Sequence, residues 1–253
     1  MKKIFLAFII LFGFLNSGFS MNDGDSIKKG AILWKENHYI DLSMDLGESV
    51  VYNSLQWDKL FAIARNRIKI GFGARFNVGN YWNKSFYTAP PQRIGGAFDT
   101  LTIQHQIVYS LNLQFVFDVP LLKWWDVGMN IDLVGVSWGP TAPASYYSYA
   151  TGNNGSTQNV SPENFNLMLF GHNDFGNLNS QFYMRFWPSN NVCIKAGMGL
   201  ATFISHTDVA LNNGNNRFNA GSYMGFISLG WTPGRNELNA DYIGRRKLIT
   251  PVF

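Results

Sequence analysis

The sequence predicts an all-β protein, an antiparallel up-and-down transmembrane β-barrel with eight strands, ten being the alternative count. From Leu101 to Val119 every second residue is apolar except His105, and most of the residues between are polar and uncharged or acidic. This period of two predicts a strand, because successive side chains leave opposite faces of the backbone. The stretch exceeds the ~5–6 residues of an ordinary strand and the ~9–11 that a tilted strand needs to cross a bilayer. A content of 16% aromatic and 14% charged residues also fits a chain with one lipid-facing side.

The chain begins with the features of a secretory signal. Lys2 and Lys3 precede an apolar run, and Gly18 and Ser20 provide the small residues of a cleavage site. We therefore expect a signal peptide at 1–20, an N-terminal lead at 21–36, the barrel at 37–232 and a tail at 233–253 on the periplasmic side.

Charge and cysteine content exclude some functions. Without Lys2 and Lys3 the formal charge falls from +4 to +2, which indicates no nucleic-acid partner. Cys193 is the single cysteine, so the chain can form neither an intrachain disulfide nor a Cys-based metal cluster.

Two strand regions precede Leu101. Residues 40–46 and 50–57 alternate in polarity around Gly47, Glu48 and Ser49, which predicts a first hairpin, although one long strand with a bulge at Gly47 also fits. Residues 68–78 form the next predicted strand, and the Gly- and Pro-containing stretch 79–98 is predicted as a loop.

After Val119 the pattern continues with less regularity. Residues 127–133 alternate, with a slip in parity near Gly135, and 139–162 is predicted as a long loop. The apolar residues are odd-numbered over 165–169 and even-numbered over 182–186. A bulged strand and a hairpin both fit locally, and sidedness favours the bulge, because short turns should lie on the periplasmic side. Strands are expected over 192–204 and 218–231, with a polar loop over 207–217 between them.

The last predicted strand carries a glycine followed by alternating apolar residues and an aromatic residue, Gly225, Ile227, Leu229 and Trp231. This resembles the terminal strand by which outer-membrane barrels are recognised for assembly, although 22 residues follow Trp231 here and the chain itself ends in Phe253. With both ends periplasmic, the chain resembles the small barrels of the OmpA transmembrane-domain and OmpX type, and its many Asn and Tyr residues suggest the Bacteroidota. The resemblance implies an outer-membrane location, surrounding lipid and lipopolysaccharide, and the barrel-assembly machinery as a partner.

The interior of an eight-stranded barrel is just wide enough to be filled by side chains. Charged residues on inward positions should pair there, because a buried charge needs a partner. The predicted lumen charge network is Lys69, Arg75, Asp118, Asp126, Asp132, Arg185 and Lys195. A conducting path lined by these residues is the alternative and requires ten or more strands. The predicted interface aromatics are Trp124, Trp125, Trp138, Trp187 and Trp231.

Only His206 offers a candidate for catalysis, next to Ser205 and near Asp208. Neighbours in a strand point to opposite faces, so a hydroxyl partner for His206 has to come from an adjacent strand. A histidine at the edge of a loop is the simpler interpretation. His105 and His172 share no ligand spacing with it, so we expect no metal and no cofactor.

We therefore expect a non-enzymatic integral outer-membrane barrel with a filled lumen and a structural or surface-interaction role. The Asn- and Tyr-rich stretches 146–160 and 211–219 are candidate binding loops, and their extracellular ligand is unknown. The alternatives are a lipid A-modifying hydrolase centred on His206 and a small-solute pore. A soluble lipocalin-like barrel would need a polar exterior, which the apolar strand faces do not provide.

Overall fold

The computed structural model describes residues 35–63, 68–88, 99–122, 124–149, 151–152, 154–169, 174–211 and 214–233, all within one compact unit, Trp34–Phe253. The predicted signal peptide lies outside these residues, as do the lead up to residue 34 and the tail beyond Pro233. None of the described residues belongs to a helix long and apolar enough to span a membrane.

The described residues form eleven strands, and every pair of neighbouring strands is antiparallel. They are β1 (Lys35–Gly47), β2 (Val50–Ile63), β3 (Ile68–Thr88), β4 (Thr100–Leu122), β5 (Trp125–Trp138), β6 (Ala142–Tyr147), β7 (Asn154–Pro162), β8 (Phe165–Leu167), β9 (Leu178–Phe186), β10 (Val192–Thr207) and β11 (Arg217–Trp231). The predicted all-β antiparallel class is confirmed.

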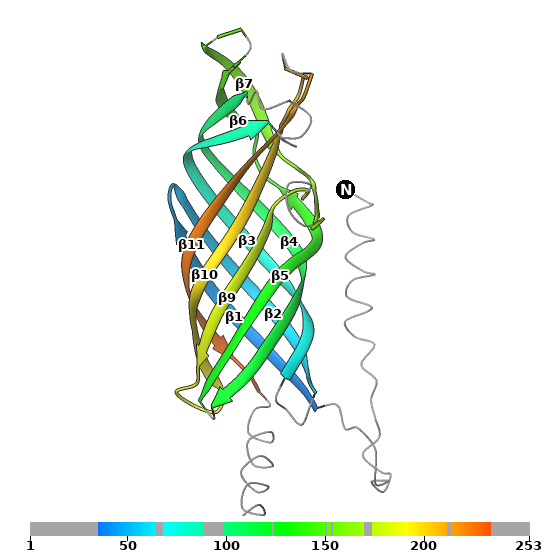
Figure 1. Ribbon diagram of the computed structural model, residues 1–253, viewed down its shortest axis with the longest axis vertical. Helices are drawn as coiled ribbons and strands as arrows, with labels where there is room; N and C mark the ends of the chain where they lie inside the picture. Colours follow the sequence, from blue (N-terminus) through cyan, green and yellow to red (C-terminus); the bar gives the residue numbers. More distant parts are fainter. Residues whose placement is uncertain are drawn as a thin grey trace, which may run out of the picture. The chain divides into compact units, whose positions relative to one another are not determined.

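Eight of these strands close into a ring, which we call the main ring (Figure 1). Its order is β1-β2-β3-β4-β5-β9-β10-β11, and β11 returns to β1. At the closure Leu42 pairs with Leu229 on one side and with Leu55 on the other. Closure leaves no unpaired strand edge, which is the condition for a sheet to cross a bilayer.

A second, smaller ring continues the barrel beyond the end of the β1–β2 hairpin. There β11 pairs directly with β3 through Phe218↔Thr88, and the β6–β7 hairpin fits between β4 and β10. The upper ends of β3, β4, β10 and β11 together with β6 and β7 form this outer ring, which lies at the top of Figure 1.

Side chains change faces where the main ring meets the outer ring. In β4, Gln104 and His105 are both exposed. On the main-ring side of them the even-numbered residues, such as Gln106, face inward. On the outer-ring side the odd-numbered residues Leu101 and Ile103 face inward instead. Our expectation that Leu101 and Ile103 face lipid is therefore wrong. Apart from His105, the apolar alternation continues through the change, and the paired strand β3 changes face at the same level with the register kept.

The remaining strands refine the predicted pattern. The first hairpin is confirmed, with a tight turn in which Ser49 has φ 58°, and the single-strand alternative is wrong. Much of both predicted loops is strand: β3 continues to Thr88, and the stretch 139–162 contains β6 and β7. The absence of an apolar period concealed them.

The predicted strand over 165–186 is interrupted by more than a bulge. β8 and β9 follow one another along the same neighbour, β5, through Val134↔Leu167 and Ile131↔Ser180. Between them lies the segment 168–177, of which 168–169 and 174–177 are described, and Phe175 pairs through its backbone with Leu167 of β8. We call this segment the strap. Opposite it, β5 has a bulge next to Leu133, close to the predicted slip at Gly135.

Candidate functional site

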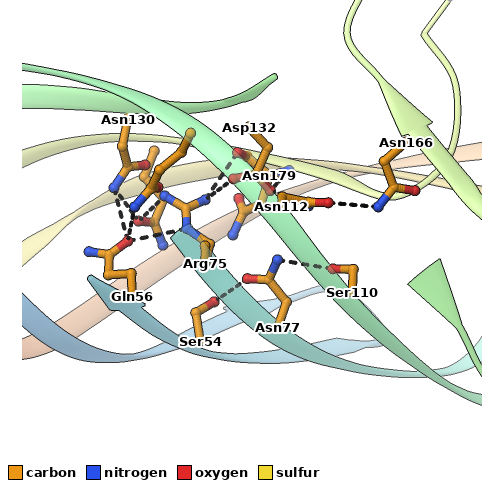
Figure 2. A network of polar contacts seen from close by, with 12 residues as sticks. Ser54, Gln56, Arg75, Asn77, Ser110, Asn112, Asn130, Asp132, Asn166 and Asn179 are labelled. Carbon is orange, nitrogen blue, oxygen red and sulfur yellow. Dashed lines mark hydrogen bonds and ion pairs between the residues drawn. The ribbon is translucent and has the colours of Figure 1, made fainter. Parts of the chain in front are cut away.

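A polar network centred on Arg75 lies inside the main ring (Figure 2). Its Nη1 lies 3.2 Å from Asp132 Oδ1 and donates to the backbone oxygen of Asn179 at 3.0 Å. Its Nε donates to Gln56 Oε1 at 3.2 Å and its Nη2 to Gln181 Oε1 at 3.4 Å. All three guanidinium nitrogens are thus bonded to groups from β2, β5 and β9, although the side chain is fully buried.

A second arginine occupies the end of the main ring at which β1 begins and β11 ends. Arg185 forms an ion pair with Asp118, and Tyr183 donates its hydroxyl to the same carboxylate at 2.6 Å. The guanidinium carbon lies 4.6 Å from the centroid of the Tyr39 ring. A cation over an aromatic face is stabilised by the ring quadrupole, so this charge has both an ionic and an aromatic partner.

Trp187 is also inside the main ring, and our prediction of it as an interface aromatic is wrong. It is only 5% exposed, and its Nε1 donates to Asp126 Oδ2 at 2.8 Å. Odd-numbered residues of β9 such as Arg185 face inward, and Trp187 continues that parity, whereas Phe186 is 41% exposed. The carboxylate of Asp126 also lies 4.0 Å from Lys69 Nζ.

Lys195 pairs with a residue that the sequence interpretation missed. Its Nζ lies 2.9 Å from Asp41 Oδ2, to which Gln56 also donates at 3.2 Å. Two further buried aspartates were missed. Gln181 donates to Asp45 at 2.8 Å, and Gln114 donates to Asp58.

All seven residues of the predicted lumen charge network lie buried inside the barrel. Ion pairs join them into three groups: Arg75 with Asp132, Arg185 and Lys69 with Asp118 and Asp126, and Lys195 with Asp41. The sequence did carry a signal for Asp41 and Asp45, because they alternate with apolar residues in the first predicted strand and so lie on its inward parity. Asp58 lies just beyond the predicted end of the first hairpin, at residue 57.

An apolar cluster fills the inside of the outer ring and continues down to the end of the polar network. Tyr52 and Phe203 pack with ring centroids 5.7 Å apart, and Tyr81 contacts Phe203 at 5.3 Å. We call this set the outer cluster: Val50, Tyr52, Tyr81, Phe86, Leu101, Ile103, Val108, Ala142, Ala144, Tyr146, Val160, Ala201, Phe203, Phe218, Ala220 and Met224.

The outside of the main ring has the opposite character. Large apolar side chains are exposed along it, among them Leu42, Leu55, Phe72, Met184, Met198, Ile227 and Leu229. Trp124, Trp125 and Trp231 are exposed at one end of this band, and Trp138 and Trp82 at the other. On β4 the partners of Trp125 and Trp138 are thirteen residues apart. At ~3.3 Å per residue and a tilt of ~45° this spans ~30 Å, the thickness of a bilayer's hydrocarbon core.

A closed barrel with an apolar outer band between two aromatic girdles is the architecture of bacterial outer-membrane proteins. This chain is an outer-membrane β-barrel. The short β4–β5 and β9–β10 connections lie at the same end of the barrel as the start of β1 and the end of β11. The outer ring lies at the other end.

Comparison with known proteins gives solved structures of low similarity. The sequence matches no protein-family model and no curated protein. Among solved structures, a major outer membrane protein from Thermus thermophilus has 10% identity and a TM-score of 0.38, over 78% of this chain and 99% of that one. The attachment invasion locus protein Ail of Yersinia pestis has 12% identity and a TM-score of 0.31, over 78% and 99%. Neisserial surface protein A has 13% identity and a TM-score of 0.30, over 76% and 95%.

The candidate catalytic histidine of this outer-membrane barrel does not meet the neighbouring serine. Ser205 is buried and contacts Gln106, whereas His206 lies on the other face of β10, with Nδ1 3.7 Å from Glu163 Oε2. Within the described part of the chain His206 Nδ1 has no hydrogen-bond partner. The geometry places the Glu163 carboxylate beside His206, and on the adjacent strand His206 is paired with Ser161, whose Oγ lies 2.9 Å from Thr141 Oγ1.

Proposed function

We propose that this protein is a non-conducting outer-membrane anchor that presents the outer ring at the cell surface for interaction. The proposal combines a filled lumen with a surface-interaction role for the β6–β7 hairpin. The single observation that carries it is the outer cluster, which lies across the inside of the barrel above the Arg75 network.

Two physical barriers support a closed lumen. An ion that enters the outer ring meets apolar side chains that cannot replace its hydration shell, and transfer of a bare charge into such surroundings is very costly. Apolar constrictions also exclude water, and this exclusion is how hydrophobic gates stop conduction in channels. Beyond the cluster, ion pairs such as Arg75–Asp132 cross the interior and occupy the space of a path.

The outer ring supports the surface role. Above the change of face most of its buried side chains are apolar, and its outward residues, for example Ser145 and Thr157, are polar. A sheet with that arrangement is stable in water, so the ring extends beyond the membrane. Lipid and lipopolysaccharide surround the apolar band below it, and the pattern ending at Trp231 supports recognition by the barrel-assembly machinery.

Electrical recording tests the proposal. The purified full-length chain, verified as folded by its heat-modifiable electrophoretic mobility, is added to planar bilayers in concentrated KCl, with a general porin as the positive control. We expect no conductance steps when the porin in the same bilayers gives them. Reproducible steps from the folded protein overturn the closed lumen and favour the small-solute pore.

A further inference from the structure

The outside of the outer ring carries a row of hydroxyl groups in register across four strands. Ser85 of β3 pairs with Thr102 of β4, Thr102 with Ser145 of β6, and Ser145 with Thr157 of β7. Ser85 Oγ and Thr102 Oγ1 lie 3.4 Å apart, and Ser145 and Thr157 are exposed. Because neighbouring strands are ~4.7–4.9 Å apart, this hydroxyl row has a regular spacing.

A second row follows two residues further along the same face. Tyr87 pairs with Thr100, and Thr100 pairs with Tyr147. Tyr87 is 49% exposed and Tyr147 is 41% exposed, so two phenol rings flank a threonine beside the hydroxyl row. We call these three residues the tyrosine row. Together the two rows form one continuous face over β3, β4, β6 and β7.

The hairpin part of this face is uncharged. From Gly139 to Pro162 the sequence contains no Asp, Glu, Lys, Arg or His. A sulfated, phosphorylated or charged peptide partner would find no opposite charge along the hairpin. The exposed residues that the structure describes in β6 and β7 are Pro143, Ser145, Tyr147, Gly155, Thr157 and Asn159, mostly polar groups, so the face also lacks the contiguous apolar patch that binds a hydrophobic partner.

The turn end of the β6–β7 hairpin is held in place from within. Tyr146 is buried, donates its hydroxyl to Asp99, and packs on Phe218 with ring centroids 6.4 Å apart. The backbone N–H of Tyr149 donates to the same carboxylate at 2.9 Å. The exposed Tyr147 ring is therefore presented by a fixed backbone, which lowers the entropy lost on binding.

We propose that the hydroxyl row and the tyrosine row bind uncharged saccharide units of the surrounding lipopolysaccharide. Serine and threonine hydroxyls both donate and accept, as sugar hydroxyls do, and the phenol rings provide flat surfaces for the C–H faces of sugar rings. The rows lie on the wall of the ring rather than at its tip, so they face sideways into the layer that lipopolysaccharide saccharides occupy. This inference rests on the proposed function, because it requires the outer ring to extend beyond the membrane.

Binding of delipidated polysaccharide tests this inference. The probe is prepared from the lipopolysaccharide of the producing cells, separated into neutral and anionic fractions, and titrated against the full-length protein in detergent. We expect the neutral fraction to bind. The double variant Y87A/Y147A should weaken binding on the order of tenfold, about 1.4 kcal/mol, because both flat ring surfaces are lost.

Two variants serve as controls. Tyr147→Phe keeps the ring and should keep most of the affinity, and Tyr149→Ala removes an exposed ring outside the two rows and should change nothing. Heat-modifiable mobility verifies that each variant is folded. Absence of binding by the folded wild type, binding of the anionic fraction only, or equal loss in Tyr149→Ala and Y87A/Y147A overturns the inference. If the protein gives no conductance steps in planar bilayers and also binds no saccharide, only the saccharide inference is rejected. Conductance steps would instead reject the closed lumen of the proposed function.

Discussion

Arg75 Nη1 and Asp132 Oδ1 lie 3.2 Å apart inside the barrel, although β4 separates the strands that carry them. The pair therefore crosses the interior rather than lying along one seam between neighbouring strands. Asp132 also accepts hydrogen bonds from the Asn112 side chain at 2.7 Å and the Asn179 backbone at 3.0 Å. Three strands are thus tied to one carboxylate.

Removal of one partner of this pair should be costly. In Arg75→Met the carboxylate of Asp132 stays buried without its cation, and such losses typically lower the free energy of unfolding by about 3–5 kcal/mol. Urea unfolding of the barrel in lipid vesicles, followed by mobility on gels, measures the change. The double variant R75M/D132N is the control and should recover part of the loss, because neither charge remains. Additive losses in the double variant contradict a direct interaction.

The inward position of Trp187 is testable by fluorescence. Brominated lipid chains quench tryptophans that touch the acyl region, so Trp187→Phe should raise the quenchable fraction of the emission, because an unquenched residue is lost. Trp231→Phe is the matched control and should lower that fraction, since Trp231 is 47% exposed on the outer band. A lower quenchable fraction in Trp187→Phe would mean that this ring faces lipid.

The upper limit of the membrane is tested by two arginine substitutions at exposed positions. Ile227 is 57% exposed in the middle of the apolar band, and Ile227→Arg should lower the free energy of unfolding by about 2–4 kcal/mol, as charged residues do near the bilayer midplane. Thr157→Arg on the outer ring should cost about 0–1 kcal/mol, as at the bilayer surface. Equal costs at the two positions contradict a ring that extends into water.

The strap contacts the wall of the barrel through Arg217 and through the backbone pairing of Phe175 with Leu167. Arg217 lies 3.7 Å from the centroid of the Phe175 ring and donates to the backbone oxygen of Asp174. Arg217→Ala should increase hydrogen exchange over 174–177, whereas Arg217→Lys keeps the charge but loses the planar contact and should give an intermediate rate. Unchanged exchange in both variants shows that other contacts hold the strap.

The sequence predicted much of the main ring because one physical constraint acts along its full length. Side chains alternate between lipid and an interior that must neutralise its charges, so a period of two and the polar parity together mark strands and inward charges. The predicted strand over 218–231 differs from β11 by one residue. Lys69, Arg75, Arg185 and Lys195 lie on the inward parity for the same reason.

The outer ring was not predicted, because the alternation between lipid-facing apolar residues and inward polar residues does not continue into it. Leu101 and Ile103 keep the numerical parity of the lipid-facing residues and yet point inward, since the strand changes face at Gln104 and His105. β6 and β7 contain many Ser, Asn, Gly and Tyr residues, so no lipid-facing apolar period marks them. Their pairing depends on contacts with β4 and β10, which are distant in the sequence.

The most direct test of the account is the labelling of single introduced cysteines on intact cells with a membrane-impermeant maleimide. The native Cys193 is buried, so it contributes little background. Thr157→Cys on the outer ring should label on intact cells, and Asn190→Cys in the short β9–β10 turn should label only after the outer membrane is permeabilised. Labelling of Asn190→Cys on intact cells, together with protection of Thr157→Cys, would contradict presentation of the outer ring at the cell surface.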